Sequence, residues 1–126
     1  MAITGKRLQQ LARSTADGLP GVSRGRPFTD KLDVYKVAGK VFLIITDDPH
    51  EQIITVKTEP EYARSLRQRH ESIAAGRYLN KKHWISLAAG REITPALVED
   101  LVTHSYELIA ASVPAHRRPR VEVSGR

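Results

Sequence analysis

The chain has 126 residues, of which 40% are hydrophobic and 27% charged, a composition typical of a globular protein rather than a disordered or fibrous one. It carries 20 Lys and Arg against 14 Asp and Glu, and the resulting net charge of +6 permits contact with a polyanion without requiring it. The absence of cysteine excludes disulfides, thiolate zinc sites and thiol nucleophiles.

The length predicts one domain. We place it at residues 1–113, because Pro, Arg and small residues dominate from Pro114 onward and predict a flexible tail over 114–126. The charged residues of that tail are Arg117, Arg118, Arg120, Glu122 and Arg126. The N-terminus reaches charge at Lys6 before an apolar leader could form, and no later run approaches ~18 apolar residues. We therefore expect a cytoplasmic protein with no membrane partner.

The first element in chain order is a helix. Thr4 is placed as its N-cap, and Gly18 followed by Pro20 predicts its end. Leu8 and Leu11 share its apolar face, while its outward face is mildly basic and includes Lys6 and Arg13.

Three segments then read as strands. Residues 32–37 alternate in polarity, and residues 40–46 are continuously apolar, as in a strand covered on both faces. Ala38-Gly39 between them predicts a tight hairpin turn. Residues 52–57 form the next expected strand. Residues 19–22 are expected as a turn, and the passage after them, residues 23–29, could be an edge strand or a loop.

A second helix is expected to begin at Thr58, because Thr58 and Glu61 have the spacing of a capping box with Pro60 in the first turn. Tyr62, Ala63, Leu66 and His70, with Ile73 as a further candidate, would line its buried side.

The stretch around the only tryptophan predicts another strand, with Trp84 and Ser86 on one face and Ile85 and Leu87 on the other. Two interpretations of Trp84 stay open. An exposed ring beside Lys81 and Lys82 could stack on a base, whereas a buried ring would pack beneath the helices. We favour burial, because Trp84 is the largest apolar group available to a core with few aromatic residues.

The last helix follows Thr94-Pro95 and carries a long apolar stripe that includes Ser105. Its outward residues Glu99, Asp100 and Glu107 are acidic, so this helix is not expected to approach nucleic acid. The order of elements predicts an α+β fold: an antiparallel sheet whose apolar side is covered by the N- and C-terminal helices.

No pattern for catalysis or metal binding stands out. The five histidines have no spacing that presents a pair on one element, and Asp47, Asp48 and Glu51 are interpreted as a solvated acidic turn. No glycine-rich phosphate loop is present. We therefore expect a non-enzymatic protein without cofactor or metal, and a monomer.

A set of short motifs gives a sharper expectation. They are Leu19-Pro20-Gly21, Val37-Ala38-Gly39-Lys40-Val41-Phe42, Val56-Lys57, Tyr78-Leu79-Asn80-Lys81-Lys82-His83-Trp84 and Ser105-Tyr106-Glu107-Leu108. In this order they cover nearly the whole chain to Pro114, and together they resemble the MmcQ/YjbR family.

The resemblance implies a fold like that of the bacterial frataxin homologue CyaY, a twisted antiparallel sheet with helices on one side, and a DNA-binding role for a family whose biochemistry is poorly defined. The chain departs from the family pattern at Val113-Pro114-Ala115, where the family tends to have Leu-Pro-Lys. Iron binding is not expected to follow from the fold, because the first helix exposes Lys6 and Arg13 rather than a carboxylate ridge.

The leading hypothesis is a module that binds DNA phosphates with little sequence preference. The residues expected to bind are Lys36, Lys40, Lys57, Arg77, Lys81, Lys82 and Arg91, with Arg117, Arg118 and Arg120 of the tail adding affinity. The alternative is a protein-interaction or small-ligand module that uses Tyr78, Trp84 and the open face of the sheet.

Overall fold

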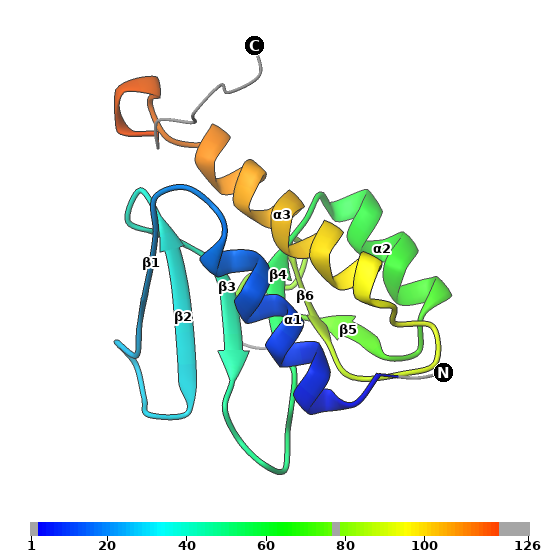
Figure 1. Cartoon of the computed structure of the whole chain (residues 1–126). Helices are drawn as coiled ribbons and strands as arrows, with labels where there is room; N and C mark the ends of the chain where they lie inside the picture. Colours follow the sequence, from blue (N-terminus) through cyan, green and yellow to red (C-terminus); the bar gives the residue numbers. More distant parts are fainter. Residues whose placement is uncertain (1–2, 77–78, 119–126) are drawn as a thin grey trace.

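A computed structural model describes residues 3–76 and 79–118, in which six antiparallel strands form one twisted sheet with helices on one face (Figure 1). The strand order is β1-β2-β3-β4-β6-β5. The elements are α1 (Gly5–Asp17), β1 (Val22–Gly25), β2 (Leu32–Val37), β3 (Lys40–Thr46), β4 (Ile54–Lys57), α2 (Pro60–Arg69), β5 (Ile73–Ala75), β6 (Trp84–Leu87), α3 (Pro95–Ala111) and a 3-10 turn, η1 (Ala115–Arg117). The expected α+β class, with both terminal helices on one face of an antiparallel sheet, is confirmed.

The two terminal helices begin where their caps predict. The hydroxyl of Thr4 accepts from the backbone N–H of Arg7 at 3.0 Å, and the hydroxyl of Thr94 accepts from that of Leu97 at 3.1 Å. Each bond satisfies one of the amides that a helix leaves unpaired in its first turn.

The expected start of α2 is wrong, because its N-cap is Glu59 and no side chain makes the capping bond. Thr58 still belongs to the sheet: it is fully buried, and its N–H donates to the carbonyl of His83 at 2.8 Å. The helix also ends at Arg69, so Ile73 lies on strand β5, where it pairs with Leu87. Tyr62 is 38% exposed rather than part of the buried side.

Strands β2 and β3 have the expected bounds. The segment left open between strand and loop contains most of the edge strand β1, which begins one residue earlier, at Val22 of the expected turn. The hairpin turn between β2 and β3 places both Ala38 (φ 52°) and Gly39 (φ 79°) in the left-handed region, the geometry of a tight two-residue turn. Strand β4 is shorter than expected, since its register with β3 begins at Ile54.

The main core lies between the sheet and the helices. Phe42 of β3 meets Tyr106 of α3 edge to face, with ring centroids 5.4 Å apart. Trp84 is buried, as favoured, but not beneath the helices: Ile85 and Leu87 belong to that core and Trp84 does not. Because side chains alternate along a strand, Trp84 faces the other side of the sheet together with Ser86.

Two side chains complete the β3–β4 ladder at its ends. The buried hydroxyl of Ser105 on α3 donates to the carbonyl of Phe42 at 2.6 Å and accepts from the N–H of Lys57 at 2.9 Å. At the opposite end, the amide of Gln9 on α1 donates to the carbonyls of Thr46 and Ile53 at 2.6 and 3.1 Å. Each terminal helix is therefore bonded to β3 and to β4 or the residue directly before it.

The first part of the segment expected as a tail has defined contacts. Residues 115–117 form η1, and the guanidinium of Arg118 donates to the carbonyls of Val113 and Ala111 at 2.9 and 3.0 Å. Arg117 donates to the carbonyl of Ala38 in the β2–β3 turn at 3.2 Å.

Candidate nucleic-acid interface

One end of the sheet gathers basic residues from four separate segments. Because the strands are antiparallel, the β2–β3 turn, the last residue of β4 and the loop before β6 lie at the same end, uppermost in Figure 1. The bond from Arg117 to Ala38 brings the segment after α3 to this end as well. We call it the basic end; its members are Lys36, Lys40, Lys57, Lys81, Lys82, Arg117 and Arg118.

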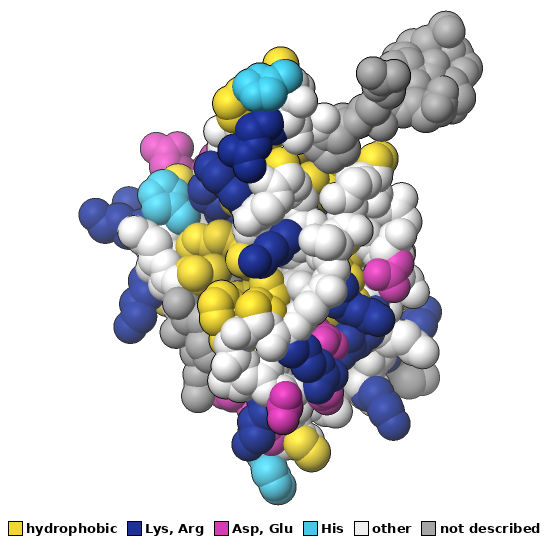
Figure 2. Space-filling model, turned by 90° about the vertical axis from the view of Figure 1, so that its left-hand side faces the viewer, with side chains coloured by type: hydrophobic (Ala, Val, Ile, Leu, Met, Phe, Trp, Pro, Cys, Tyr) yellow, Lys and Arg dark blue, Asp and Glu magenta, His cyan; other side chains and the backbone are white. Residues whose placement is uncertain are grey.

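Most of these cations are open to solvent. Lys40, Lys81, Lys82 and Arg117 are exposed, while Lys36 is half-buried. By strand alternation, Lys36 follows Val34 on the face opposite the helices, and Lys57 lies there too, directly across from Trp84. Figure 2, seen from the side on which β1 lies, shows Lys and Arg side chains from top to bottom, with acidic side chains at the upper left, at the right and, most closely mixed with the basic ones, toward the bottom.

The structure does not bring every expected residue to this surface. Arg91 lies in the turn after β6, and β6 runs away from the basic end, so Arg91 is at the opposite end of the sheet. Arg77, Tyr78 and Arg120 lie outside the described residues.

At the end of the sheet opposite the basic end, acidic and basic side chains form ion pairs. Arg26 contacts Asp33 at 2.8 Å and Asp47 at 2.9 Å, and Arg13 donates to the other oxygen of Asp33. Burial raises the pKa of Asp33, but the hydrogen bonds from Arg26 and Arg13 outweigh it, so its pKa lies below the usual range. We call this the mixed-charge end; its members are Arg13, Arg26, Lys31, Asp33, Asp47 and Asp48.

The acidic turn of the sequence belongs to this second end. Asp48 accepts from the backbone N–H of His50 at 2.9 Å and lies 3.7 Å from the ammonium group of Lys31. Arg13, expected on the outward face of α1, is instead half-buried against Asp33. The charges at this end therefore neutralise one another.

The lysines of the basic end are not neutralised in this way. Within residues 3–76 and 79–118, none of its five lysines lies within ion-pair distance of a carboxylate. On the helix side, Glu59 and Glu61 begin α2, and on the opposite face Glu51 lines one hollow with Lys81. Glu59 is engaged by His104 on α3 at 2.7 Å, and this hydrogen bond is the main cause of its lowered pKa.

Trp84 does not supply a stacking surface beside the lysines, since the residue is only 8% exposed. Gly76 explains part of this burial, because a Cβ atom on Gly76 would lie 2.5 Å from the Cβ of Trp84. The backbone approaches Trp84 so closely that only glycine fits. Recognition at this end therefore depends on charge rather than on an exposed indole.

The described residues contain no group of three or more His, Asp or Glu side chains placed to hold a metal ion. Among the helices of the described ranges, none combines the length and apolar character that crossing a membrane requires. The contact between His104 and Glu59 escaped sequence reasoning, because 45 residues separate the two and no spacing signals the pair.

These features define a small α+β domain with helices on one face of an antiparallel sheet and a cluster of basic residues at one end, whose lysines have no carboxylate partner within the described residues. A sequence model described as YjbR matches residues 17–108. The chain belongs to the YjbR family.

Relatives and solved structures agree with this assignment. The chain is 34% identical over 114 residues to the uncharacterized protein YbdF of Escherichia coli O157:H7, covering 90% of this chain and 93% of the relative. It is 27% identical to the uncharacterized protein YjbR of Escherichia coli K12, covering 79% and 84%.

Among solved structures, protein DR2400 of Deinococcus radiodurans, with a DUF419 domain, superimposes with a TM-score of 0.78 at 28% identity, covering 90% of this chain and 91% of that one. A protein from Pseudomonas syringae shares the fold with a TM-score of 0.65 at 20% identity, covering 85% and 99%.

Proposed function

We propose that this protein is a non-enzymatic, monomeric and cytoplasmic domain that binds DNA through phosphate contacts at its basic end. The observation that supports this most is the gathering of Lys36, Lys40, Lys57, Lys81 and Lys82 from distant segments without partnering carboxylates in the described chain. Unpaired ammonium groups on one surface are what a phosphate backbone engages.

The arrangement favours binding with little sequence preference. The exposed face of α3 carries Glu99, Asp100 and Glu107, so this helix would be repelled from a groove rather than inserted into it. Lysines act as compact point charges rather than as the planar, paired donors that Arg presents. We therefore expect affinity to fall steeply with salt and to change little with sequence.

The test uses a charge-matched pair of variants. Lys40→Gln/Lys81→Gln/Lys82→Gln removes three charges from the basic end, and Lys6→Gln/Lys31→Gln/Arg91→Gln removes three elsewhere. Fluorescence anisotropy with a labelled duplex at low salt should show about 10- to 100-fold weaker binding for the first variant, with a shallower salt dependence. The second should bind within about threefold of the parent chain.

Equal weakening by both variants would mean that net charge, not this surface, drives binding. No binding of the parent chain even at low salt would remove the proposal. A third chain truncated after Arg118 tests the tail: loss of all binding there would reassign the site to residues 119–126.

A hollow on the face of the sheet opposite the helices supports a second candidate function, that of a small-ligand or protein-binding module. It measures about 490 Å³ and is floored by the small residues Ala74, Gly76 and Ser86, with Lys81 at its margin. A small molecule that fills it should raise the melting temperature of the parent chain. Ala74→Trp, which would fill the hollow from an exposed position on β5, should abolish that shift without weakening DNA binding.

A further inference from the structure

The hollow on the sheet face opposite the helices follows strands β5 and β6. Its lining extends from Ser72, before β5, to Gly76, after it, which is about 13 Å along an extended chain. We call it the sheet hollow. Its volume of about 490 Å³ lies within the range of sites that bind small molecules.

Small side chains form the floor of the sheet hollow. Ala74 is exposed and lies directly across from Ser86, whose hydroxyl is 2.8 Å from that of Thr55. Gly76 follows on the same face, where a Cβ atom would lie 2.5 Å from the Cβ of Trp84. Because no large side chain stands on this floor, a flat ring can lie over it.

The two ends of the sheet hollow carry opposite charges. Lys81 lines the hollow at the basic end, and Glu51 lines it at the mixed-charge end, before β4. The turn that carries Lys81 is fixed, because the side chain of Asn80 accepts from the N–H of Lys82 at 2.9 Å and its carbonyl accepts from that of Trp84 at 3.0 Å. A matching ligand is anionic at one end and donates a hydrogen bond at the other.

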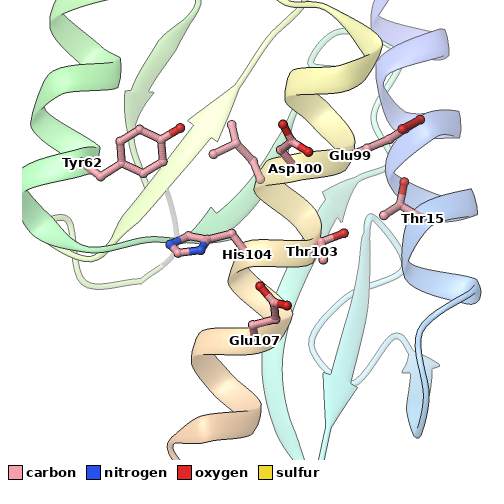
Figure 3. A pocket seen from close by; sticks show the side chains of 8 residues that line it. Thr15, Tyr62, Glu99, Asp100, Thr103, His104 and Glu107 are labelled. Carbon is pink, nitrogen blue, oxygen red and sulfur yellow. The ribbon is translucent and has the colours of Figure 1, made fainter. Parts of the chain in front are cut away.

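A larger hollow over α3 is acidic instead. It measures about 560 Å³ and is lined by the exposed carboxylates of Glu99, Asp100 and Glu107 (Figure 3). Its His104 is already bonded to Glu59 at 2.7 Å. Since like charges repel, an anionic ligand is directed to the sheet hollow rather than to the hollow over α3.

We propose that the sheet hollow binds a nucleoside monophosphate, with its phosphate at Lys81 and an amino-bearing base over Ala74 and Ser86, directed toward Glu51. A carboxylate has several acceptor positions, so Glu51 can accept from the amino group of a base in addition to a donor of the protein. This ligand class depends on the second candidate function above, that of a small-ligand module.

A second lysine favours a phosphate over a singly charged anion. Trp84 of β6 pairs with Lys57 on one side, and on the other its carbonyl accepts from the N–H of Gly76 at 2.7 Å. Lys57 therefore lies on the face of the hollow, one strand beyond Trp84. Two ammonium groups near the basic end of the hollow suit the nearly double negative charge of a phosphate monoester.

Calorimetric titration of the full chain with adenosine 5′-monophosphate (AMP) tests the site. Lys81→Gln should weaken AMP binding about tenfold, whereas Lys40→Gln, which removes an exposed lysine of the basic end that does not line the hollow, should change it less than about twofold. Ala74→Trp should abolish binding by filling the hollow. Ala96→Trp, at an exposed position of α3, is its control.

Fragments of the nucleotide test the ligand class. Adenosine, without the phosphate, and inorganic phosphate, without the base, should each bind at least about tenfold more weakly than AMP. Inosine monophosphate, in which a carbonyl replaces the amino group, should bind several-fold more weakly than AMP, and Glu51→Ala should remove this preference. Equal affinity for the two nucleotides in the parent chain would contradict the placement of the base at Glu51.

Two results would overturn the site. Unchanged AMP affinity in Lys81→Gln and Ala74→Trp would place the nucleotide elsewhere, and inorganic phosphate binding as tightly as AMP would show that charge alone is recognised. If AMP does not bind, but another small molecule raises the melting temperature of the parent chain and not of Ala74→Trp, the nucleotide is refuted and the small-ligand function stands.

Duplex binding separates this site from the proposed DNA contact. Lys81 belongs both to the basic end and to the sheet hollow, so AMP should weaken duplex binding to the parent chain more than inorganic phosphate does at the same concentration. Ala74→Trp should lose this effect of AMP. An equal effect in Ala74→Trp would refute the competition, whereas AMP binding without duplex binding by any variant would refute the DNA contact and leave the nucleotide site standing.

Discussion

The two ends of the sheet are stabilised by different kinds of bond. At the mixed-charge end, Asp33 is held between Arg13 and Arg26, and Arg26 extends the network to Asp47. At the basic end, the elements are joined mainly by hydroxyl groups and backbone carbonyls: Ser105 bridges Phe42 and Lys57, and Tyr106 donates to Pro20 at 2.6 Å.

The difference indicates how a surface can remain charged and still be well ordered. Opposite charges stabilise the first end but leave little net charge for a ligand. Neutral hydrogen bonds fix the second end and leave its lysines without carboxylate partners in the described chain. Changes at each end should therefore have separable effects on stability and on binding.

The largest effect is expected from Asp33→Ala. The side chain is only 7% exposed, and its loss would leave the half-buried guanidinium of Arg13 without its partner. We expect the free energy of unfolding to fall by about 2–4 kcal/mol, with DNA binding of the folded chain unchanged. Urea denaturation measures the first, and Asp30→Ala, an exposed acid nearby, should cost under about 0.5 kcal/mol.

The next effect is expected from Ser105→Ala, which leaves the carbonyl of Phe42 and the N–H of Lys57 without this partner. A loss of about 2 kcal/mol is expected, and amide hydrogen exchange at Lys57 should accelerate. Ser112→Ala, at the end of the same helix, is the matched control. Unchanged exchange at Lys57 would contradict the bridging role.

A smaller effect is expected from Tyr106→Phe, which removes the bond to Pro20 but keeps the ring against Phe42. The cost should be about 1 kcal/mol by thermal denaturation. Burial raises the pKa of Tyr106, so its absorbance change should occur at higher pH than the usual phenol value predicts. A titration of Tyr106 at or below the usual phenol value would contradict this.

The smallest effect is expected from mild acid, which should lower the stability contributed by Asp33 at the mixed-charge end. Because the folded pKa of Asp33 is lowered, its contribution to stability is complete above the unfolded pKa of about 4 and is lost as the pH falls through the folded value. The stability difference between the parent chain and Asp33→Asn should therefore be constant from pH 5 to 7 and shrink below about pH 4. A constant difference down to about pH 2 would contradict the assignment.

Sequence patterns predicted the helix starts and strands that depend on residues close together in the chain. The hydroxyls of Thr4 and Thr94 cap their helices, and the alternating and apolar runs gave β2 and β3 their bounds. Strand β5 escaped prediction, because three residues carry too little periodicity, and Ile73 also fits the apolar face of the preceding helix. Only its pairing with Leu87, which is distant in sequence, makes it a strand.

In the candidate site too, the sequence identifies the basic residues but not which of them lie together. Strand order and direction decide which lysines gather, and the sequence does not display that order. Arg91 and Lys81 are both expected on the phosphate-binding surface, yet Lys81 precedes β6 and Arg91 follows it, and the two ends of a strand lie at opposite ends of the sheet. The face on which Trp84 lies depended in the same way on which side of the sheet the helices cover.

The single hydroxyl of Ser105 makes the rotation of α3 critical for the lysine surface. One residue inserted into or deleted from this helix would turn every following position by about 100°, carrying Ser105 away from both strands. The phase of the helix, more than the identity of its outward residues, therefore sets how closely β3 and β4 can approach where Lys40 and Lys57 emerge.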